Sequence, residues 1–417
     1  MSFDSEKNHR FSLFSIFFTF FIDTLGVTIV FPIFAPLFLN PHETILSPLL
    51  SYNTKSAILG LFLAAYPLAQ FVFSPIIGEF ADRFGRKKAL LITTILTCVG
   101  YILCALSIKH KWVYLLFLSR LVMGSSAGNL ALCLSAIADL SKNQKDRVKR
   151  YGIGSMLAGI TFVIGPFIGG KLSDTTLHPF FNLSFPLWVG AVFAGINVFF
   201  LLFAFVETIS LKLQHSFDFI GGLRNIQFAF KIQAIRPLYL MYFFYLLSWN
   251  MLFQLIPAFL VTKFSAKISL IGDISAIMGL SWVIGSALLY KVFLPHFRSK
   301  SLLVFEALFF AIAVFACAYL KEIWIFSAIV GFSVLIASFG WPLCTGIISN
   351  SAPKEVQGKI LSLSQSIQSL AMMLAPVIVG PFLSKQSGIP FFIAAGFSII
   401  FGALVVTTKF QEYFHPD

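Results

Sequence analysis

One short stretch of the sequence joins a turn to a cluster of positive charges: Gly78-Glu-Phe-Ala-Asp82-Arg83-Phe-Gly85-Arg86-Lys87-Lys88-Ala-Leu90. Glycine lets two helices approach through a tight turn, and Asp82 is suited to cap a helix or to meet its positive end. The apolar runs 56–77 and 89–107 flank the stretch, and a helix needs about 20 such residues to cross the hydrocarbon core of a membrane. The stretch therefore predicts two membrane-spanning helices joined by the basic loop 78–88.

The composition of the whole chain also indicates a membrane protein. Of the 417 residues, 58% are hydrophobic and only 11% are charged, and the mean hydropathy is +0.88. A soluble protein needs about a quarter of its residues charged to cover its surface, so secreted, fibrous, disordered and ordinary cytosolic proteins are excluded. The five cysteines lie in apolar stretches without CxxC spacing and are interpreted as small buried hydrophobes. The seven histidines are scattered in loops and tails, so we expect neither a metal site nor a cofactor.

Twelve apolar runs are long enough to span a membrane. In the first half they are Phe11–Leu39, Ser56–Ile77, Ala89–Ser107, Trp112–Ala138, Gly152–Leu172 and Pro186–Val206. In the second half they are Pro237–Val261, Ile271–Leu289, Ser301–Leu320, Trp324–Ile348, Ile360–Leu383 and Pro390–Thr408. The first run is too long for the apolar region of a signal peptide, so we expect it to remain as a helix. The expected fold is an all-α integral membrane protein.

The distribution of basic residues predicts the orientation of the spans. The connections on the same side as the N-terminus hold 21 Lys and Arg, and those on the opposite side hold eight. Cytoplasmic connections carry the excess of positive charge in membrane proteins. Both termini are therefore expected in the cytoplasm, in a multi-pass protein of the inner (plasma) membrane. The net charge of +13 is explained by topology, and no nucleic-acid partner is expected.

Few charged side chains fall inside the predicted spans. Asp23 lies near the middle of the first run, Arg120 lies within the fourth, and Glu306 lies a turn or two inside the ninth. A charge within a membrane is costly and is a functional candidate by default. The alternative for Asp23 and Arg120 is a buried structural ion pair.

The chain divides into two similar halves. We expect an N-terminal six-helix bundle (1–206), a central cytoplasmic loop (207–236) and a C-terminal six-helix bundle (237–417). An offset of 210 residues aligns Pro166-Phe-Ile-Gly-Gly170 with Pro376-Val-Ile-Val-Gly380. Two repeated bundles are an architecture of transporters, whose substrate site lies between the halves near mid-membrane.

The stretch from Gly78 to Leu90 closely resembles the signature of the major facilitator superfamily, which joins the second and third helices of that fold. The resemblance implies twelve helices in two pseudo-symmetric bundles that rock about a central cavity. It also implies that the signature loop holds one gate in a single state. The residues assigned to this gating loop are Gly78, Asp82, Arg83, Gly85, Arg86 and Lys87.

Further motifs resemble the twelve-helix drug and tetracycline–proton antiporters. The fourth run contains Arg120-x2-Met123-Gly124-x-Ser126-Ala127-Gly128, and the first contains Asp23-x2-Gly26-x5-Pro32. The fifth run departs from the antiporter pattern at Thr161, where Gly is usual, and otherwise retains Gly152, Gly165, Pro166, Gly169 and Gly170. Small residues let helices pack closely, and proline bends a helix.

The resemblance implies that a carboxyl group couples transport to protons. Asp23 is the candidate, with Arg120 as its counter-charge or as a separate structural anchor. Polar or aromatic side chains inside the spans are candidates for lining the substrate cavity, although such groups also bond helices to one another. They are Gln70, Asn129, Trp249, Asn250, Gln254 and Gln365.

The leading hypothesis is proton-coupled export of small amphipathic or drug-like compounds, and the alternative is a proton symporter that imports a nutrient or metabolite. A membrane enzyme would need a His, Ser/Asp or metal constellation within the spans, and no His occurs there. A channel would usually need a ring of subunits. We therefore expect a transporter that works as a monomer and meets a small-molecule substrate, protons and the lipid bilayer.

Overall fold

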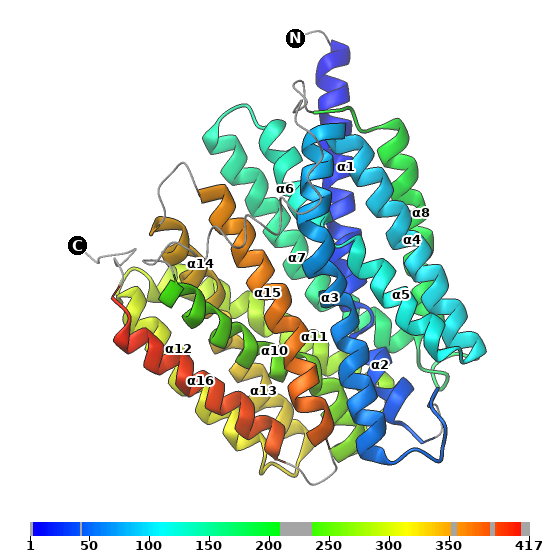
Figure 1. Cartoon of the computed structure of the whole chain (residues 1–417), viewed down its shortest axis with the longest axis vertical. Helices are drawn as coiled ribbons and strands as arrows, with labels where there is room; N and C mark the ends of the chain where they lie inside the picture. The colour runs from blue at the N-terminus through cyan, green and yellow to red at the C-terminus, as the bar shows by residue number, and fades with distance from the viewer. Residues whose placement is uncertain (1–2, 42–43, 209–235, 352–356, 384–387, 410–417) are drawn as a thin grey trace. The chain divides into compact units, whose positions relative to one another are not determined.

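The computed structural model is described for residues 3–41, 44–208, 236–351, 357–383 and 388–409, and all its regular elements there are helices (Figure 1). The first half comprises α1 (Phe3–Thr28), α2 (Phe31–Leu39), α3 (Tyr52–Phe84), α4 (Arg86–His110), α5 (Val113–Ser125), α6 (Asn129–Asp139), α7 (Gln144–Leu172) and α8 (Phe185–Phe203). The second half comprises α10 (Arg236–Phe264), α11 (Ile268–Leu288), the π-helix η1 (Leu289–Phe293), α12 (Ser299–Cys317), α13 (Ile323–Ala337), α14 (Gly340–Asn350), α15 (Gln357–Val379), the 3₁₀-helix η3 (Gly380–Phe382) and α16 (Ile389–Thr407).

The described helices form twelve stretches long and apolar enough to cross a membrane, which confirms the predicted fold. Three of these spans are interrupted, between α1 and α2, between α5 and α6, and between α13 and α14. At each interruption a backbone N–H bonds the carbonyl three residues back: Ile33 to Val30, Ala127 to Gly124, and Phe339 to Ile336. Such tightened turns are poorer helix geometry and change the direction of the axis.

The turn in the signature stretch is shorter than the predicted loop 78–88. Helix α3 continues through Gly78 to Phe84, and α4 begins at Arg86, so only Gly85 separates the two helices. Gly85 has φ +104°, a value that side chains rarely tolerate and that glycine adopts freely. The prediction of a tight glycine turn is correct at Gly85 and wrong at Gly78.

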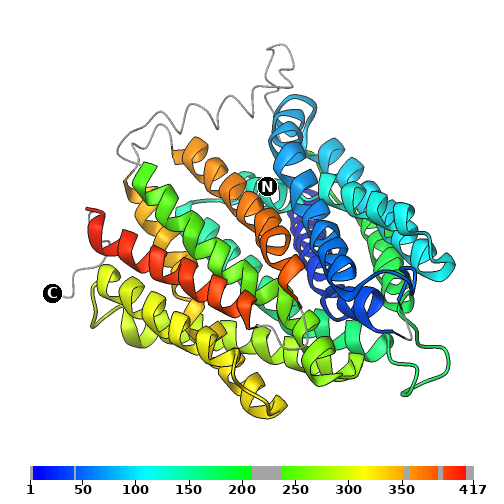
Figure 2. The same ribbon diagram turned by 60° about the horizontal axis from the view of Figure 1, so that its bottom comes forward.

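Two compact units make up the chain: Met1–Ile33 with Ala65–Leu223, called unit 1 here, and Phe34–Ala64 with Arg224–Asp417, called unit 2. Within each unit the helices run side by side with their connections at the ends (Figure 2). The predicted central loop, 207–236, falls almost entirely outside the described residues. The division at that loop therefore stays a prediction.

Unit 2 is built around α10, which packs against α14, α15 and α16. In the most apolar 18-residue segment of α10, 78% of the residues are buried, a larger share than in any other described span. The first half of α3 meets α15 at Gly60, where an added Cβ would lie 3.2 Å from the carbonyl carbon of Pro376.

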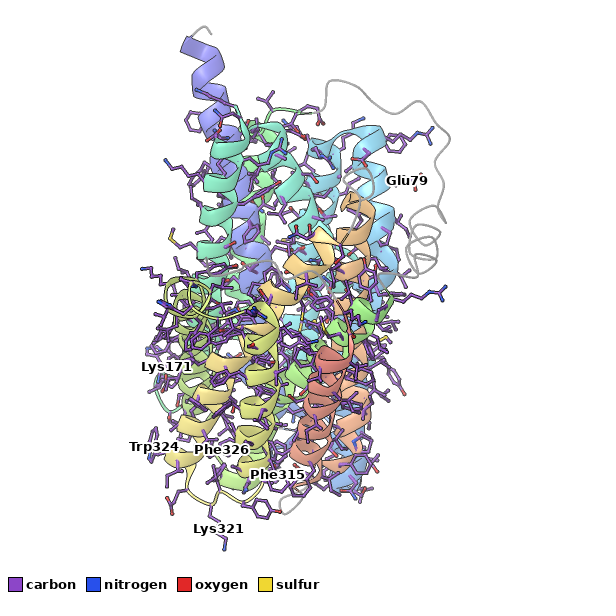
Figure 3. The ribbon with its side chains drawn as sticks, turned by 90° about the vertical axis from the view of Figure 1, so that its left-hand side faces the viewer. Glu79, Lys171, Phe315, Lys321, Trp324 and Phe326 are labelled. Atoms are coloured by element: carbon purple, nitrogen blue, oxygen red, sulfur yellow. The ribbon has the colours of Figure 1, made fainter. Side chains whose placement is uncertain are left out.

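At the beginning of α13, Trp324 is 64% exposed while Phe326 is buried (Figure 3). Exposed tryptophans are typical of the membrane–water interface.

Candidate functional site

The predicted coupling residue Asp23 is half-buried in unit 1 and lies next to two buried polar side chains, Asn129 and Thr93. The amide Nδ2 of Asn129 donates to Asp23 Oδ1 at 3.3 Å, and the hydroxyl of Thr93 on α4 contacts Asn129 Oδ1. Asn129 is the first residue of α6, directly after the break at residues 126–128. The interruption of the fourth span thus places an amide against the acid of the first span.

Arg120, on α5, lies close to the same network. Its guanidinium carbon is 4.9 Å from the centre of the Tyr66 ring, a cation–π geometry, and the side chain is 5% exposed. Tyr66 on α3 and Tyr101 on α4 interact electrostatically with both Asp23 and Arg120. The direct ion pair that was the alternative for Asp23 and Arg120 stays a prediction. Both predicted charges nevertheless belong to one cluster.

The glycine motif of α7 lies against the same helix that carries Asp23. A Cβ on Gly165 would stand 2.9 Å from the Cβ of Thr28, and one on Gly169 would stand 3.1 Å from the carbonyl carbon of Ile29. The hydroxyl of Thr28 in turn donates to the carbonyl of Thr161 at 3.0 Å. These two glycines let the backbones of α1 and α7 touch about a turn beyond Asp23.

The other residues of that motif have different surroundings. Pro166 and Gly170 are buried within α7. A Cβ added to Gly152 would have no atom within 4 Å, and the same holds for a Cβ added to Gly78 on α3. The structure therefore gives Gly165 and Gly169 a packing role that Gly152 does not share.

The signature stretch forms an ionic cluster at the start of α4. Arg86 Nη1 lies 3.1 Å from Asp82 Oδ1, and Arg86 Nε lies 3.5 Å from Asp139 Oδ2 at the end of α6. The hydroxyl of Thr208 also donates to Asp139 Oδ2, at 3.2 Å. One guanidinium thus joins the ends of α3 and α6 to the beginning of α4.

A carboxylate from beyond α8 completes this arrangement. The side chain of Glu207 accepts hydrogen bonds from the backbone N–H of Arg86 at 2.9 Å and of Lys87 at 3.2 Å. A negative group at this position satisfies unpaired N–H groups and stabilises the helix dipole. A Cβ on Gly85 would lie 2.8 Å from Glu207 Cδ, so glycine is needed for this approach as well as for its φ. Lys87 Nζ donates to the carbonyl of Leu202 at 2.9 Å and bonds α4 to the end of α8.

Asp139 and Glu207 belong to this cluster and were not predicted from the sequence. Both were visible as acids at the ends of the fourth and sixth spans, next to basic connections. Arg83, which was predicted to act in the loop, places its guanidinium 5.2 Å from the Phe84 ring centre.

The candidates for the substrate cavity fall into three groups. Asn250 and Gln254 are buried on α10 and hydrogen-bonded: Gln254 Nε2 donates to Asn250 Oδ1 at 3.3 Å and to the carbonyl of Met372 on α15 at 2.9 Å. Trp249 packs with Trp282 of α11, with ring centres 4.7 Å apart.

The remaining candidates lie on three different helices. Gln70 is half-buried on α3, Gln365 is exposed on α15, and Asn129 belongs to the Asp23 network. Contact of any of the six with a substrate stays a prediction. In the part of the chain that the structure describes, no group of three or more His, Cys, Asp or Glu is arranged to hold a metal ion.

Comparison with known proteins places these features in a family. The model of the Major Facilitator Superfamily matches residues 16–376 and, in a second match, residues 238–416. The class H tetracycline resistance protein of Pasteurella multocida is 22% identical over 404 residues, which cover 94% of each chain. The quinolone resistance protein NorA of Staphylococcus aureus (strain COL) is 25% identical over 409 residues, covering 96% of this chain and 97% of its own.

Solved structures show the same fold at lower identity. A D-xylose–proton symporter matches 98% of both chains with a TM-score of 0.73 and 15% identity. The human organic anion transporter MFSD10 matches 95% of this chain and 99% of its own, with a TM-score of 0.69 and 18% identity. Since the family model covers most of the sequence and the described helices supply its twelve spans, the chain belongs to the Major Facilitator Superfamily and is a membrane transporter, not an enzyme.

Proposed function

We propose that this transporter exports small amphipathic or drug-like compounds in exchange for protons, by alternating access. It acts as a single chain in the inner (plasma) membrane with both termini in the cytoplasm. Two relatives named for resistance to tetracycline and to quinolones support the export of such compounds. The excess of Lys and Arg on the side of the N-terminus supports the orientation.

The observation that carries the proposal is the setting of Asp23. An acid midway along a membrane span is rare and is typical of proton pathways. The hydrogen bond from Asn129 favours the carboxylate, whereas removal of water favours the neutral acid. A conformational change that alters hydration or the position of Asn129 would load or release a proton at Asp23.

The ionic cluster around Arg86 has a separate role in the proposal. It joins the ends of α3, α6 and α8 to the start of α4, and such a cluster stabilises the conformation in which it is formed. We assign it to gating, because moving these helix ends apart would separate opposite charges. Gly165 and Gly169 support the mechanism by keeping α1 and α7 in close contact.

The test is proton flux in proteoliposomes that contain an internal pH dye. Lipophilic cations, tetracyclines, quinolones and common metabolites are added in turn to wild type, Asp23→Asn and Asp146→Asn. Asp146 is the matched control, since its carboxylate lies outside the spans. We expect cargo-dependent proton movement opposite to the cargo, abolished by Asp23→Asn and retained by Asp146→Asn.

Two results would overturn parts of the proposal. Proton movement in the same direction as the cargo would establish the second candidate, a symporter, whose fold this chain shares at 15% identity. Coupled flux that persists in Asp23→Asn would remove Asp23 from the coupling pathway.

A further inference from the structure

A second acid is buried in the membrane, in unit 2, and the proposed mechanism does not use it. Glu306 lies on α12 and is 1% exposed. It is the eighth residue of that helix, so at about 1.5 Å per residue it lies roughly 10 Å along the helix from its start.

The cation on the same helix as Glu306 is Lys300, six residues before it, and Lys300 Nζ donates to the carbonyls of Val406 and Thr408 at the end of α16. Helix α12 packs against α13, α14 and α16, and neither α13 nor α16 contains a titratable side chain. The titratable groups that interact electrostatically with Glu306 are the Tyr245 hydroxyl on α10 and the Cys344 thiol on α14. No ion pair involves Glu306 among the described residues.

One oxygen of the carboxyl group also lacks a hydrogen-bond donor. Its Oε2 is buried without a hydrogen-bond partner in the described part of the chain. The hydroxyl of Tyr245 donates to the carbonyl of Ala337 at 2.8 Å, and that of Ser398 donates to the carbonyl of Ala307 at 2.8 Å. Because each hydroxyl has one hydrogen to donate, these two have none left for a carboxylate.

The protonation state of Glu306 depends on the cost of burying an ionised carboxylate. An isolated buried charge is so unfavourable that the group becomes neutral instead. A protonated acid needs no counter-charge, and its burial is far less costly than that of an ion. The site therefore suits a carboxylic acid and does not suit a carboxylate.

We propose that Glu306 is a proton-binding site of unit 2, separate from Asp23. It holds its proton while α12 is packed as described here, and it loses the proton when water reaches the carboxyl group. In that step the O–H bond of the acid breaks, the proton passes to a water molecule, and the carboxylate remains. Coupling of this step to cargo rests on the proposed function, whereas the protonated state of Glu306 does not.

Infrared spectroscopy of the protein in lipid vesicles tests the proposal directly. A protonated carboxyl group has a carbonyl stretching band separate from the amide bands. At neutral pH we expect a component of this band that Glu306→Gln removes and that Asp23→Asn leaves in place. Identical acid-band spectra for wild type and Glu306→Gln would overturn the proposal.

Two additional measurements keep the outcome decisive. If Glu306→Gln does not fold, as judged by its amide bands, Glu306→Asp replaces it: we expect that variant to shift the component, and an unshifted band would contradict the assignment. In the flux assay, Glu306→Gln should move one proton fewer per cargo molecule, and an unchanged ratio would refute exchange at this site. Absence of cargo-driven flux in wild type would refute the proposed function and leave the infrared result to decide the state of Glu306.

Discussion

The connection between α3 and α4 and the connection between α11 and α12 occupy corresponding places in the two halves, and they are built differently. The first is a single glycine, and the carboxylates of Asp82, Asp139 and Glu207 meet at the start of α4. The second passes through the π-helix η1, and residues 289–305 contain no acid. There Lys300 donates to the carbonyls of Val406 and Thr408, at 2.9 and 3.4 Å, at the end of α16.

The two connections differ in their ionic contacts. In the first half, one guanidinium and one capping carboxylate hold together helix ends that are far apart in sequence. In the second half, Lys300 meets the negative end of the α16 helix dipole, which is a weaker and more local interaction. We therefore expect the proposed gating function to depend on the first connection much more than on the second.

The largest effect is expected for Arg86→Ala. The change leaves the Asp82 and Asp139 carboxylates near one another without their shared cation, and both are part-exposed. Allowing for solvent screening, we expect a loss of about 1–2 kcal/mol in the free energy of unfolding and a transport rate reduced by roughly tenfold. Thermal unfolding and cargo flux measure the two quantities. Arg83→Ala is the matched control, and an equal loss in that variant would show that total charge, not this cluster, matters.

A smaller effect is expected for Glu207→Ala. Removing a side-chain cap from a helix start costs about 0.5–2 kcal/mol, and the amide hydrogens of Arg86 and Lys87 lose their acceptor. Hydrogen exchange at these two amides should accelerate, and Glu207→Gln should retain part of the protection because it keeps one acceptor oxygen. Unchanged exchange in Glu207→Ala would show that the cap is not formed in the membrane.

Lys300→Met tests the second connection. It removes a donor from the end of α16, and contacts of this kind are worth less than about 1 kcal/mol when exposed. We expect a small fall in melting temperature and a transport rate close to wild type. A loss as large as that of Arg86→Ala would contradict the proposed asymmetry between the two halves.

The smallest effect is expected at Asp146, at the start of α7. Its carboxylate accepts from the backbone N–H of Lys142 and from Arg150, and these contacts lower the pKa of Asp146 below its ordinary value. A lowered pKa adds stability at neutral pH that is lost as the pH falls through the folded-state pKa. Wild type should thus be slightly more stable than Asp146→Asn at neutral pH, with the two curves converging in acid. A constant difference at every pH would exclude titration as the cause.

Much of the fold followed from the sequence, and several details of the site did not. Apolar runs of sufficient length gave the twelve spans, because a backbone in lipid must satisfy its hydrogen bonds within a helix. The predicted loop 78–88 is only Gly85 in the structure. The helices α3 and α4 extend beyond their apolar runs into the polar residues of this stretch. Asn129 and Gln254 were identified as buried polar residues, but their partners could not be inferred from helical spacing.

The sequence by itself determined the class of protein, the number of spans, the family signature and the presence of charges inside the membrane. These properties depend on local composition, which decides whether a segment prefers lipid or water. Tertiary structure alone decided which groups meet: Asn129 lies 106 residues from Asp23, and Glu207 lies 121 residues from the amide of Arg86 that it caps. Such pairings arise when helices pack, so the spacing of residues along one chain does not contain them.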